Sequence, residues 1–364
     1  MRRRMLCALL AVLTLLGLAA CGGTPAEETE EIQAEIQEEP TPVPEPEPEP
    51  APYVPSGTNP LTGEPMEEVY EADRPVAVMF NNLKAAQPQI GISKADIIYE
   101  VPAEGGITRM LALYQCLEGV ETLGSVRSTR PYYIELALAH DALLVHAGGS
   151  PEAYQDISSW GVDNMDGVNG GSDAGIFWRD QDRRRTMGYE HSMVTSGENI
   201  LAYLAEDHFR RQHQEGYTES LAFAEDGASA AGAAAEHISL KFSYYKTGTF
   251  DYDAASGTYL VGQYGGAYTD GADGTQVSAV NVLVLETSIY VNAGDTAGRM
   301  TAKLTGEGEG TFFCGGKSVP IRWSRADRYS PFVYTLADGT PLTMGRGKSY
   351  ICIINPRDST LTVT

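Results

Sequence analysis

Apolar residues between positions 76 and 145 occur in short runs, and each run is bounded by residues that favour turns. The runs at 76–80, 95–101 and 107–117 are the clearest examples. A Glu-Gly-Gly sequence at 104–106, with the composition of a turn, separates the last two. Short apolar runs between turn residues are typical of buried strands, so the folded part of the chain is predicted to begin with these strands.

Helix signals follow these runs and continue to about residue 212. Pro131 comes after a Ser-Thr pair at 128–129, and either hydroxyl could cap a helix that begins at the proline. Ser150 repeats this signature, and Thr195 begins a capping box for a helix that extends to about residue 210. Residues 59–212 are therefore predicted to form a mixed-sheet α/β domain with covering helices.

From residue 238 onward the apolar positions alternate with polar ones, as they do in strands. An Ala-Asp-Gly-Thr sequence at 337–340 is a hairpin signal, and 349–354 forms a last apolar run. Residues 238–364 are predicted to form a smaller β-rich domain, and the Ala- and Gly-rich segment 213–237 a linker or variable loop. The expected fold class is thus α+β or mixed α/β.

The first residues of the chain have the pattern of a lipoprotein signal peptide. Three arginines precede an apolar run from 5 to 20, and Leu-Ala-Ala leads directly into Cys21. We expect cleavage after residue 20, lipidation of Cys21 by acyl chains such as palmitate, and a location at the extracytoplasmic face of the cell membrane. An ordinary signal peptide with a chance cysteine and an uncleaved anchor remain the alternatives.

Residues 21–58 are rich in proline and glutamate and contain no lysine or arginine. Proline favours an extended conformation and like charges repel each other, so this segment is predicted to be a disordered tether between lipid and folded body. At about 3.1 Å per residue it could span on the order of 100 Å. Recognition of its prolines by a partner domain is the alternative.

Charge and cysteine content exclude several classes of function. The chain has 26 Lys and Arg against 49 Asp and Glu, a formal charge of -23, which makes a nucleic-acid partner improbable. The folded part contains Cys116, Cys314 and Cys352, which lack metal-ligand spacing and are expected to be buried thiols. At most one disulfide could form among them, and a cysteine nucleophile is the alternative. The scattered histidines predict no metal site, and no cofactor is expected.

The loops of the first predicted domain contain a cluster of arginines. Arg127 and Arg130 flank Ser128 at a predicted strand-to-helix junction, and Arg109 lies near the start of the preceding strand. Guanidinium groups bind phosphate or carboxylate in a bidentate manner, so the cluster predicts an anion site. The alternative is that these arginines pair with nearby acidic residues and hold loops in place: Glu100, Glu104 and Asp96.

A second candidate segment joins a predicted strand, a glycine turn and a capped helix. His146 ends the strand, and Gly148 and Gly149 permit a tight turn or a close ligand. His146 could donate or accept a proton near neutral pH, or it could simply bond a backbone carbonyl. His191 could approach the same face. No catalytic residue is assigned, and whether the protein is an enzyme stays open.

Long ordered motifs in both halves resemble the YerB-like bacterial lipoproteins, a family of two paired domains of unknown function. The resemblance covers residues 59 to about 200 and 238–356. Glu190-His191-Ser192 departs from the family's usual His-Asn, which puts any shared role of this loop in doubt. The motifs that carry the resemblance are Asn59-Pro60-Leu61-Thr62-Gly63, Ala95-Asp96-Ile97-Ile98-Tyr99-Glu100, Val126-Arg127-Ser128-Thr129-Arg130-Pro131-Tyr132, His146-Ala147-Gly148-Gly149-Ser150 and Ala279-Val280-Asn281-Val282. The resemblance implies an extracytoplasmic lipoprotein without an established reaction.

The order of elements around the arginines is also similar to that of the LytR-CpsA-Psr cell-wall ligases, in which arginines hold a polyprenyl pyrophosphate. This resemblance implies such a role for Arg109, Arg127 and Arg130. The acidic metal ligands of that family have only Asp96 and Glu100 as candidates here.

Taken together, the sequence predicts a membrane-tethered lipoprotein whose first domain binds an anionic envelope ligand bearing phosphate or carboxylate. An enzyme that acts on polyprenyl-phosphate-linked or glycan cell-wall substrates is one alternative. A scaffolding partner of another envelope protein is the second, and an importer's solute-binding protein is a minor third.

Overall fold

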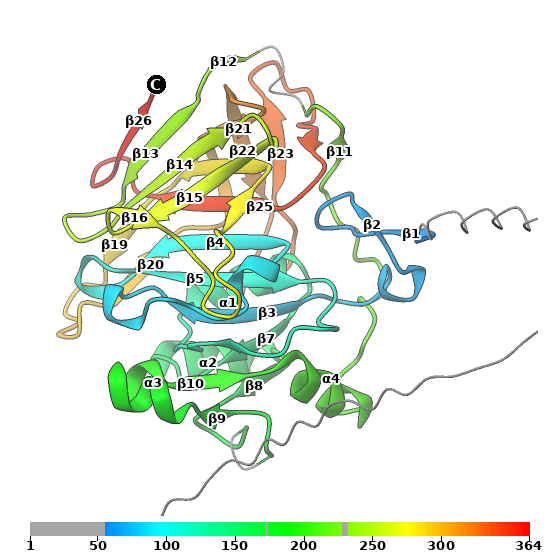
Figure 1. Cartoon of the computed structure of the whole chain (residues 1–364), viewed down its shortest axis with the longest axis vertical. Coiled ribbons are helices and arrows are strands. Elements are labelled where there is room, and N and C mark those ends of the chain that lie inside the picture. The colour runs from blue at the N-terminus through cyan, green and yellow to red at the C-terminus, as the bar shows by residue number, and fades with distance from the viewer. Residues whose placement is uncertain (1–54, 172–173, 228–231) are drawn as a thin grey trace, which may run out of the picture. The chain divides into compact units, whose positions relative to one another are not determined.

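The computed structural model describes residues 55–171, 174–227 and 232–364 (Figure 1). The predicted signal peptide, Cys21 and nearly all of the predicted tether lie outside these residues. Among the helices that the structure describes, none is long and apolar enough to cross a membrane.

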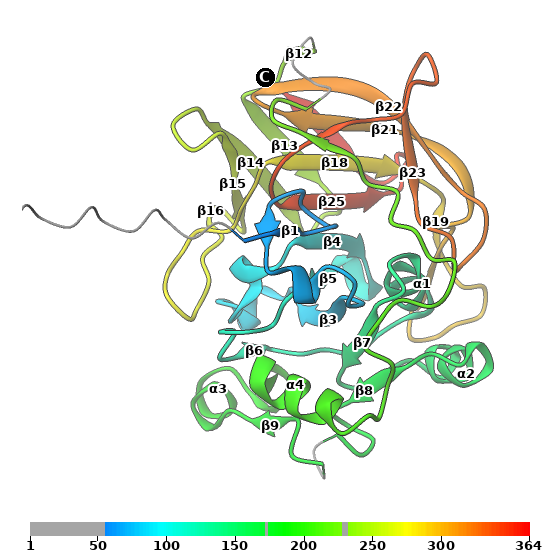
Figure 2. The same cartoon turned by 90° about the vertical axis from the view of Figure 1, so that its right-hand side faces the viewer.

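One large mixed sheet runs through the described chain, and Figure 2 shows its central strands lying one below another. Its strands, in spatial order, are β12 (Ala233–Ala234), β22 (Lys317–Arg325), β21 (Gly306–Cys314), β18 (Asn281–Glu286), β25 (Ser349–Ile354), β4 (Ile97–Pro102), β5 (Thr108–Tyr114), β3 (Val76–Asn81), β7 (Leu143–His146) and β8 (Asn164–Asp166), with β23 (Val333–Leu336) paired to β22.

A second sheet packs against one face of the first. Its strands are β16 (Gly266–Ala267), β15 (Thr258–Gln263), β14 (Thr247–Asp253), β13 (His237–Lys241) and β26 (Thr360–Val363), with β17 (Ser278–Ala279) paired to β15. Four smaller pairings complete the strands: β1 (Gly57–Thr58) with β2 (Pro65–Met66), β10 (Met193–Thr195) with β6 (Leu123–Gly124) and β9 (Trp178–Arg179), β11 (Phe223–Ala224) with β24 (Met344–Gly345), and β19 (Ile289–Val291) with β20 (Met300–Ala302).

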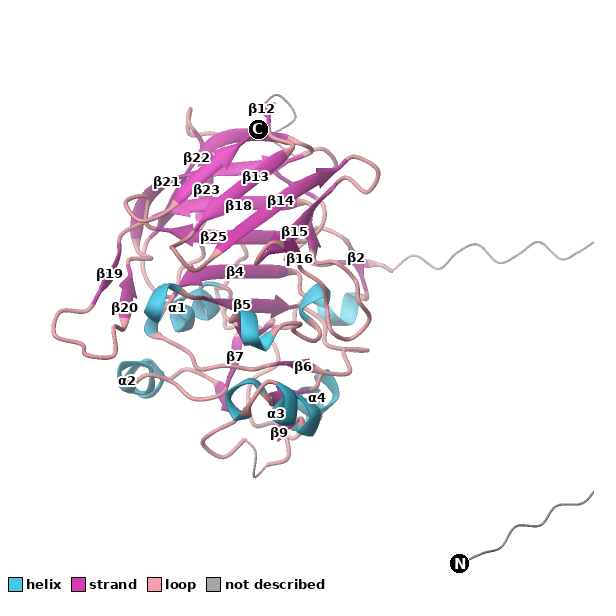
Figure 3. Cartoon of the chain, turned by 60° about the vertical axis from the view of Figure 1, so that its left-hand side comes forward, coloured by secondary structure: helices cyan, strands magenta, loops and turns pink. Residues whose placement is uncertain are grey.

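The helices all come before residue 206 and lie together in one part of the molecule (Figure 3). The α-helices are α1 (Pro131–Ala139), α2 (Pro151–Trp160), α3 (Gln181–Thr186) and α4 (Gly197–Ala205). Single 3-10 turns are η1 (Glu68–Tyr70), η2 (Lys84–Ala86), η3 (Ile92–Lys94), η4 (Glu104–Gly106) and η5 (Tyr189–His191). A mixed α/β half followed by a β-rich half confirms the predicted fold class.

The two faces of the main sheet build two apolar clusters because side chains alternate along each strand. In β3, Val78 and Phe80 join the cluster that includes Phe250 of the second sheet, whereas Ala77 and Met79 join the cluster under α1. Every residue of β3 is buried, as is every residue of β5. The apolar runs seen in the sequence are therefore strands covered on both sides.

The main sheet is continuous across the two predicted domains. Strand β25, near the end of the chain, pairs in parallel with β4, with Ser349 opposite Ile97 and Cys352 opposite Glu100. The described residues belong to a single compact unit. The boundary near 213–237 therefore separates two segments of sequence that share one sheet.

Two predicted caps differ from those observed. Helix α1 begins at Pro131 as predicted, but its N-cap is Arg130, without a capping side-chain bond, in place of the Ser-Thr pair at 128–129. For α4 the cap is Ser196, whose Oγ accepts from Asn199 N at 3.0 Å, because Thr195 is buried and its hydroxyl donates to Ile176 O. Ser150 caps α2 as predicted, accepting from Ala153 N at 3.1 Å.

Candidate functional site

An open cleft of about 580 Å³, here called the strand-end cleft, lies beside the carboxyl ends of β3, β7 and β8. These three strands run parallel, so their carboxyl ends meet at one edge of the sheet. Such edges are where α/β sheets commonly bind ligands. The lining residues that bear on its chemistry are Arg127, Ser128, Gly148, Gly149, Arg179 and Glu190.

Backbone bonds fix Arg127 at the edge of this cleft. Its N–H donates to Met79 O in β3 at 2.9 Å, and its carbonyl accepts from Ala147 N, just after β7, at 3.1 Å. Thr129 N then donates to Gly148 O at 2.9 Å. The arginine side chain therefore starts from an anchored backbone rather than from a free loop.

The glycine turn after β7 brings the chain close to Ser128. Gly148 has φ +84°, and a β-carbon there would approach Ser128 Oγ to 3.1 Å. Ser128 Oγ donates to Ala147 O at 3.0 Å. Glycine is suited to position 148 because the backbone is left-handed and space is tight.

Asp166, at the end of β8, organises the wall of the cleft. Its carboxylate accepts from Gly148 N at 2.8 Å, Val168 N at 2.9 Å, Tyr154 OH at 2.8 Å and Asn169 Nδ2 at 2.7 Å. Burial opposes ionisation, but nearby His146 and these donors outweigh it and hold the pKa of Asp166 below its usual value. Asp166 therefore remains charged, and its carboxylate is hydrogen-bonded to groups of the protein itself.

The Arg127 side chain meets one exposed carboxylate. Its Nη2 lies 2.8 Å from Glu190 Oε2, and the side chains are 24% and 68% exposed. Ion pairs this open to water contribute only about 0–1 kcal/mol. The contact between Arg127 and Glu190 therefore contributes little to the stability of the fold.

Arg179 supplies a second guanidinium to the cleft. Its Nη1 donates to Tyr189 O at 2.7 Å, and its Cζ lies 3.8 Å from the centre of the Tyr189 ring. Arg184 also approaches this ring, at 5.5 Å. Among the described residues that line the cleft, Arg127 and Arg179 are thus the cations and Glu190 is the acid.

Arg109 and Arg130 do not line the cleft. Both contact Glu104: Arg130 Nε bonds its Oε1, and Arg109 Nη2 lies 3.5 Å from its Oε2. Burial acts against the charge of Glu104, yet Arg130 and Arg109 lower the pKa of its carboxyl. These two arginines thus form the loop-holding contacts that the sequence left open as the alternative to an anion site.

His146 is fully buried and faces oxygen atoms on both sides. Its Nδ1 lies 2.9 Å from Gly148 O, and its Nε2 lies 3.1 Å from Asn164 Oδ1. The ring thus supports the glycine turn from beneath and is not exposed to a ligand. His191 lies next to the cleft, with Nδ1 2.9 Å from Asn81 Nδ2, and burial, together with Arg127 and Arg183, lowers its pKa.

The acidic candidates have partners within the protein, and the described cysteines are thiols. Asp96 accepts from Asn59 Nδ2 and Gln115 N, and Glu100 belongs to a buried network. Within the described ranges, no group of three or more His, Cys, Asp or Glu side chains is arranged to hold a metal. No disulfide joins the three described cysteines, Cys116, Cys314 and Cys352, and burial raises the pKa of the Cys352 thiol.

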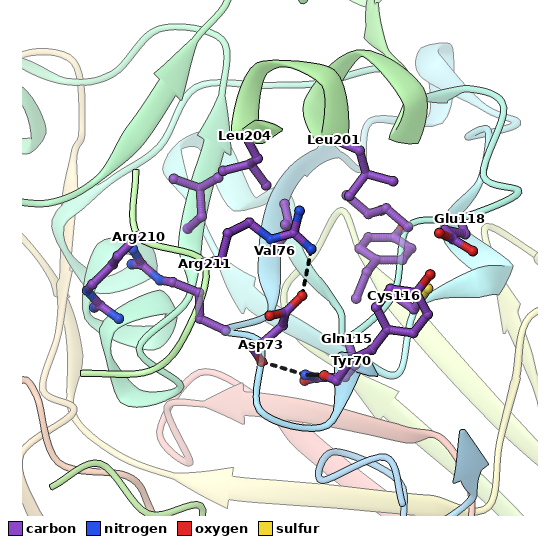
Figure 4. Close-up of a pocket in the computed structure, with 14 residues that line it drawn as sticks. Tyr70, Asp73, Val76, Gln115, Cys116, Glu118, Leu201, Leu204, Arg210 and Arg211 are labelled. Atoms are coloured by element: carbon purple, nitrogen blue, oxygen red, sulfur yellow. Dashed lines mark hydrogen bonds and ion pairs between the residues drawn. The ribbon is translucent and has the colours of Figure 1, made fainter. Parts of the chain in front are cut away.

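A narrower pocket lies near the opposite ends of β3 and β7 (Figure 4). Leu201 and Leu204 of α4 border it, and Arg211 pairs with Asp73 at 2.7 Å. Gln115 Nε2 donates to Asp73 O at 2.6 Å, while its Oε1 has no partner among the residues that the structure describes. With about 30 Å³ of space, this pocket has room for one or two water molecules rather than for a ligand.

Comparison with known proteins gives consistent matches in both halves of the chain. Residues 61–210 match the model of "Protein of unknown function (DUF3048) N-terminal domain", and residues 238–351 match its C-terminal domain. The chain is 31% identical over 305 residues to "Putative lipoprotein YerB" of Bacillus subtilis (strain 168), covering 82% of this chain and 87% of that protein. A crystal structure of the YerB protein from Bacillus subtilis superposes with a TM-score of 0.72 at 29% identity, covering 84% of this chain and all of the other.

Proposed function

The chain belongs to the family of the DUF3048 N-terminal and C-terminal domains, and we propose that it is a membrane-anchored extracytoplasmic lipoprotein whose strand-end cleft binds an anionic envelope ligand. The ligand class is a phosphate- or carboxylate-bearing compound. The family description carries no reaction, so the proposal rests on the residues of this chain.

The anchor is supported by two independent observations. The sequence that precedes Cys21 has the charge, apolar length and small residues of a lipoprotein signal. The related YerB protein also carries the name of a lipoprotein. Lipid on Cys21 would hold the body at the outer face of the membrane, where phosphorylated lipids and anionic polymers are available.

The observation that carries the ligand proposal is the pairing of Arg127 with Glu190. An anchored guanidinium at a strand-end cleft is held by a carboxylate that is 68% exposed. The same cleft contains Arg179, which donates to a backbone carbonyl and lies against an aromatic ring. The carboxylate of Glu190 thus occupies the place beside Arg127 that we propose for the anion of a ligand.

Removing Arg127 and Arg179 should weaken the binding of an anion strongly. A charge-assisted hydrogen bond contributes about 1.5–3 kcal/mol, which corresponds to roughly ten- to more than a hundredfold in affinity. A ligand that binds Arg127 breaks its ion pair with Glu190, which reduces the free energy of binding by at most about 1 kcal/mol. Loss of both arginines should therefore abolish measurable binding, whereas loss of a surface arginine elsewhere should have little effect.

The test uses the Cys21→Ala protein, which lacks the thiol for lipidation, and inorganic pyrophosphate as the probe in calorimetric titrations. Arg127→Ala combined with Arg179→Ala should eliminate the binding seen with the parent. Arg185→Ala is the matched control, since Arg185 is 76% exposed and pairs with Asp182 outside the cleft lining.

A second arm replaces pyrophosphate with phosphatidylglycerol vesicles and distinguishes a lipid headgroup from a free phosphate. Binding of vesicles that the double substitution removes would identify a lipid ligand. Failure of the parent protein to bind either probe, or equal binding by the double variant, would refute the proposal.

A further inference from the structure

A second hollow, remote in sequence from the strand-end cleft, lies on the smaller sheet. It has a volume of about 710 Å³, within the ~300–1,000 Å³ that is typical of small-molecule sites. Its lining comes from β14, β15, β16 and the turns beside them. In Figure 3 the strands β13, β14 and β15 lie in front of the main sheet. We call this feature the β14–β16 hollow.

One wall of the hollow is a row of polar side chains on β14. Thr247, Thr249 and Asp251 are two residues apart, so they share one face of the strand. The intervening Phe250 is fully buried on the opposite face. This wall therefore presents two hydroxyls and a carboxylate away from the core.

Glycines leave room above this polar row. Gly262 pairs with Thr249 across the sheet, and a β-carbon there would come within 2.4 Å of Thr249 Oγ1. Gly266, in the edge strand β16, has nothing within 4 Å of the place where its β-carbon would stand. The absence of side chains at these positions keeps the hollow open.

Two tyrosines form an aromatic border. Tyr245 is 38% exposed, and its ring centre lies 5.9 Å from that of Tyr264 at an interplanar angle of 73°. Tyrosine combines an apolar ring face with a polar hydroxyl, which suits ligands that are partly apolar and rich in hydrogen-bonding groups. The C–H edges of a sugar ring match the negative face of such a ring.

Gln263 forms a buried floor beneath the hollow, with its side chain turned toward Lys246. The side-chain Oε1 of Gln263 accepts a bond from Lys246 Nζ. Because an ammonium group can only donate, this contact fixes the orientation of the amide. Its Nε2 has no partner, although Gln263 is only 7% exposed. This Nε2 atom is enclosed by the protein, so the hydrogen-bonding groups offered to a ligand come from the polar row of β14 instead.

The charge of the hollow favours a neutral ligand. Asp251 is the one charged residue among the lining residues in the described part of the chain, and it pairs with His237 at the surface. Lys246 lies beneath, 1% exposed at its side chain and 3.2 Å from Glu100. Without an exposed cation the hollow cannot neutralise an anion, in contrast to the strand-end cleft.

We propose that the β14–β16 hollow binds a neutral oligosaccharide, with a sugar ring stacked on Tyr245 and hydroxyls bonded to the polar row of β14. Hydroxyls and a carboxylate beside an aromatic face supply donors and acceptors that a sugar can use. This site gives the protein a second contact with its surroundings that does not depend on the arginines of the strand-end cleft.

The test titrates the Cys21→Ala protein with three neutral probes: cellohexaose, maltohexaose and the hexamer of N-acetylglucosamine. At least one should bind, and Tyr245→Ala should weaken it about tenfold or more through loss of the stacking face. Gly266→Val should block the hollow without a clash. Tyr245→Phe keeps the ring and should retain binding.

Two control substitutions outside the β14–β16 hollow test whether the loss of binding is specific to it. Tyr290→Ala removes a tyrosine that is 55% exposed and lies elsewhere, in β19, and should leave binding unchanged. Arg127→Ala should also leave it unchanged, so failure of the anion proposal would not affect this result. If none of the three sugars binds, or if Tyr245→Ala binds as tightly as the parent with an unchanged thermal midpoint, the proposal is wrong. Should Gly266→Val fail to fold, Tyr245→Ala decides alone.

Discussion

A buried ion pair between the two halves of the chain should determine how stably they fold together. Lys246 Nζ lies 3.2 Å from Glu100 Oε1, and each side chain is 1% exposed. The carboxylate also accepts from Thr108 Oγ1 at 2.5 Å, Asn82 Nδ2 at 3.0 Å and Tyr350 OH at 2.5 Å. Burial alone lowers the pKa of Lys246, and Glu100 opposes that effect.

Replacing Lys246 with methionine keeps the length of the side chain but leaves the Glu100 charge without its cation. Removing one partner of a buried pair costs about 3–5 kcal/mol because the other charge stays desolvated. In a body of this size the thermal midpoint should fall by on the order of 10 °C. Lys241→Met, on an exposed lysine of β13, should change stability by no more than about 0.5 kcal/mol.

Urea unfolding followed by both tryptophan fluorescence and far-ultraviolet circular dichroism provides the measurement. Since β25 and β4 join the halves in one sheet, the two probes should report a single coincident transition in the parent protein. The double variant Glu100→Gln, Lys246→Met should lose less than the sum of the single losses, because neither charge is then left alone. A Lys246→Met protein within 1 kcal/mol of the parent would refute this reasoning.

Three further predictions concern the anchor and two partly buried carboxylates. Cys21→Ala should release the protein from the membrane fraction or leave an unprocessed precursor, and membrane retention of a processed variant in fractionation would exclude the lipid anchor. Glu104→Gln should lower the free energy of unfolding by about 3–5 kcal/mol, as measured in urea, because Arg109 and Arg130 lose their shared carboxylate; an unchanged midpoint would show that they do not depend on it. Burial raises the pKa of Asp96 to about 6, although Gln115 N–H and Asn59 oppose it. The folded state then holds the proton more tightly than the unfolded state, so the contribution of Asp96 is greatest below about pH 4 and declines as the pH rises through 6. The destabilisation caused by Asp96→Asn should therefore shrink by up to about 3 kcal/mol between pH 4 and pH 7.5 in urea titrations, and a destabilisation that grows with pH would contradict this sign.

Local signals in the sequence predicted several elements of the fold. The apolar runs became buried strands because a strand covered on both faces needs apolar residues at every position. Ser150 caps α2 since its hydroxyl reaches the third helical amide. The cap of α4 moved from Thr195 to Ser196 because burial of Thr195 gave its hydroxyl another partner, Ile176 O, which no local pattern announces.

The sequence patterns did not predict which strands far apart in the chain pair with each other. The contact of β25 with β4 joins residues about 250 positions apart, and periodicity along one strand does not identify its neighbour. The sequence also grouped Arg109, Arg127 and Arg130 by their spacing. In the structure Arg109 and Arg130 both contact Glu104, whereas Arg127 lines the cleft and pairs with Glu190.

The sequence identified some of the residues that form the strand-end cleft. The sequence pointed to Arg127, Ser128, Gly148 and Gly149, all of which line it, and to His146, which lies buried beneath it. Asp166 was missed, since its role depends on four donors that come together only in the fold. The one signal for it was an acidic residue directly before a glycine at 167.

An anion that binds in the strand-end cleft should displace the carboxylate of Glu190 from Arg127. Calorimetric titration of inorganic pyrophosphate into the parent, Arg127→Ala and Glu190→Gln proteins measures this exchange. Opposite effects are expected at the two ends of one ion pair: at least tenfold weaker binding for Arg127→Ala and tighter binding for Glu190→Gln. Equal affinities for all three proteins, or weaker binding by Glu190→Gln with an unchanged thermal midpoint, would contradict it.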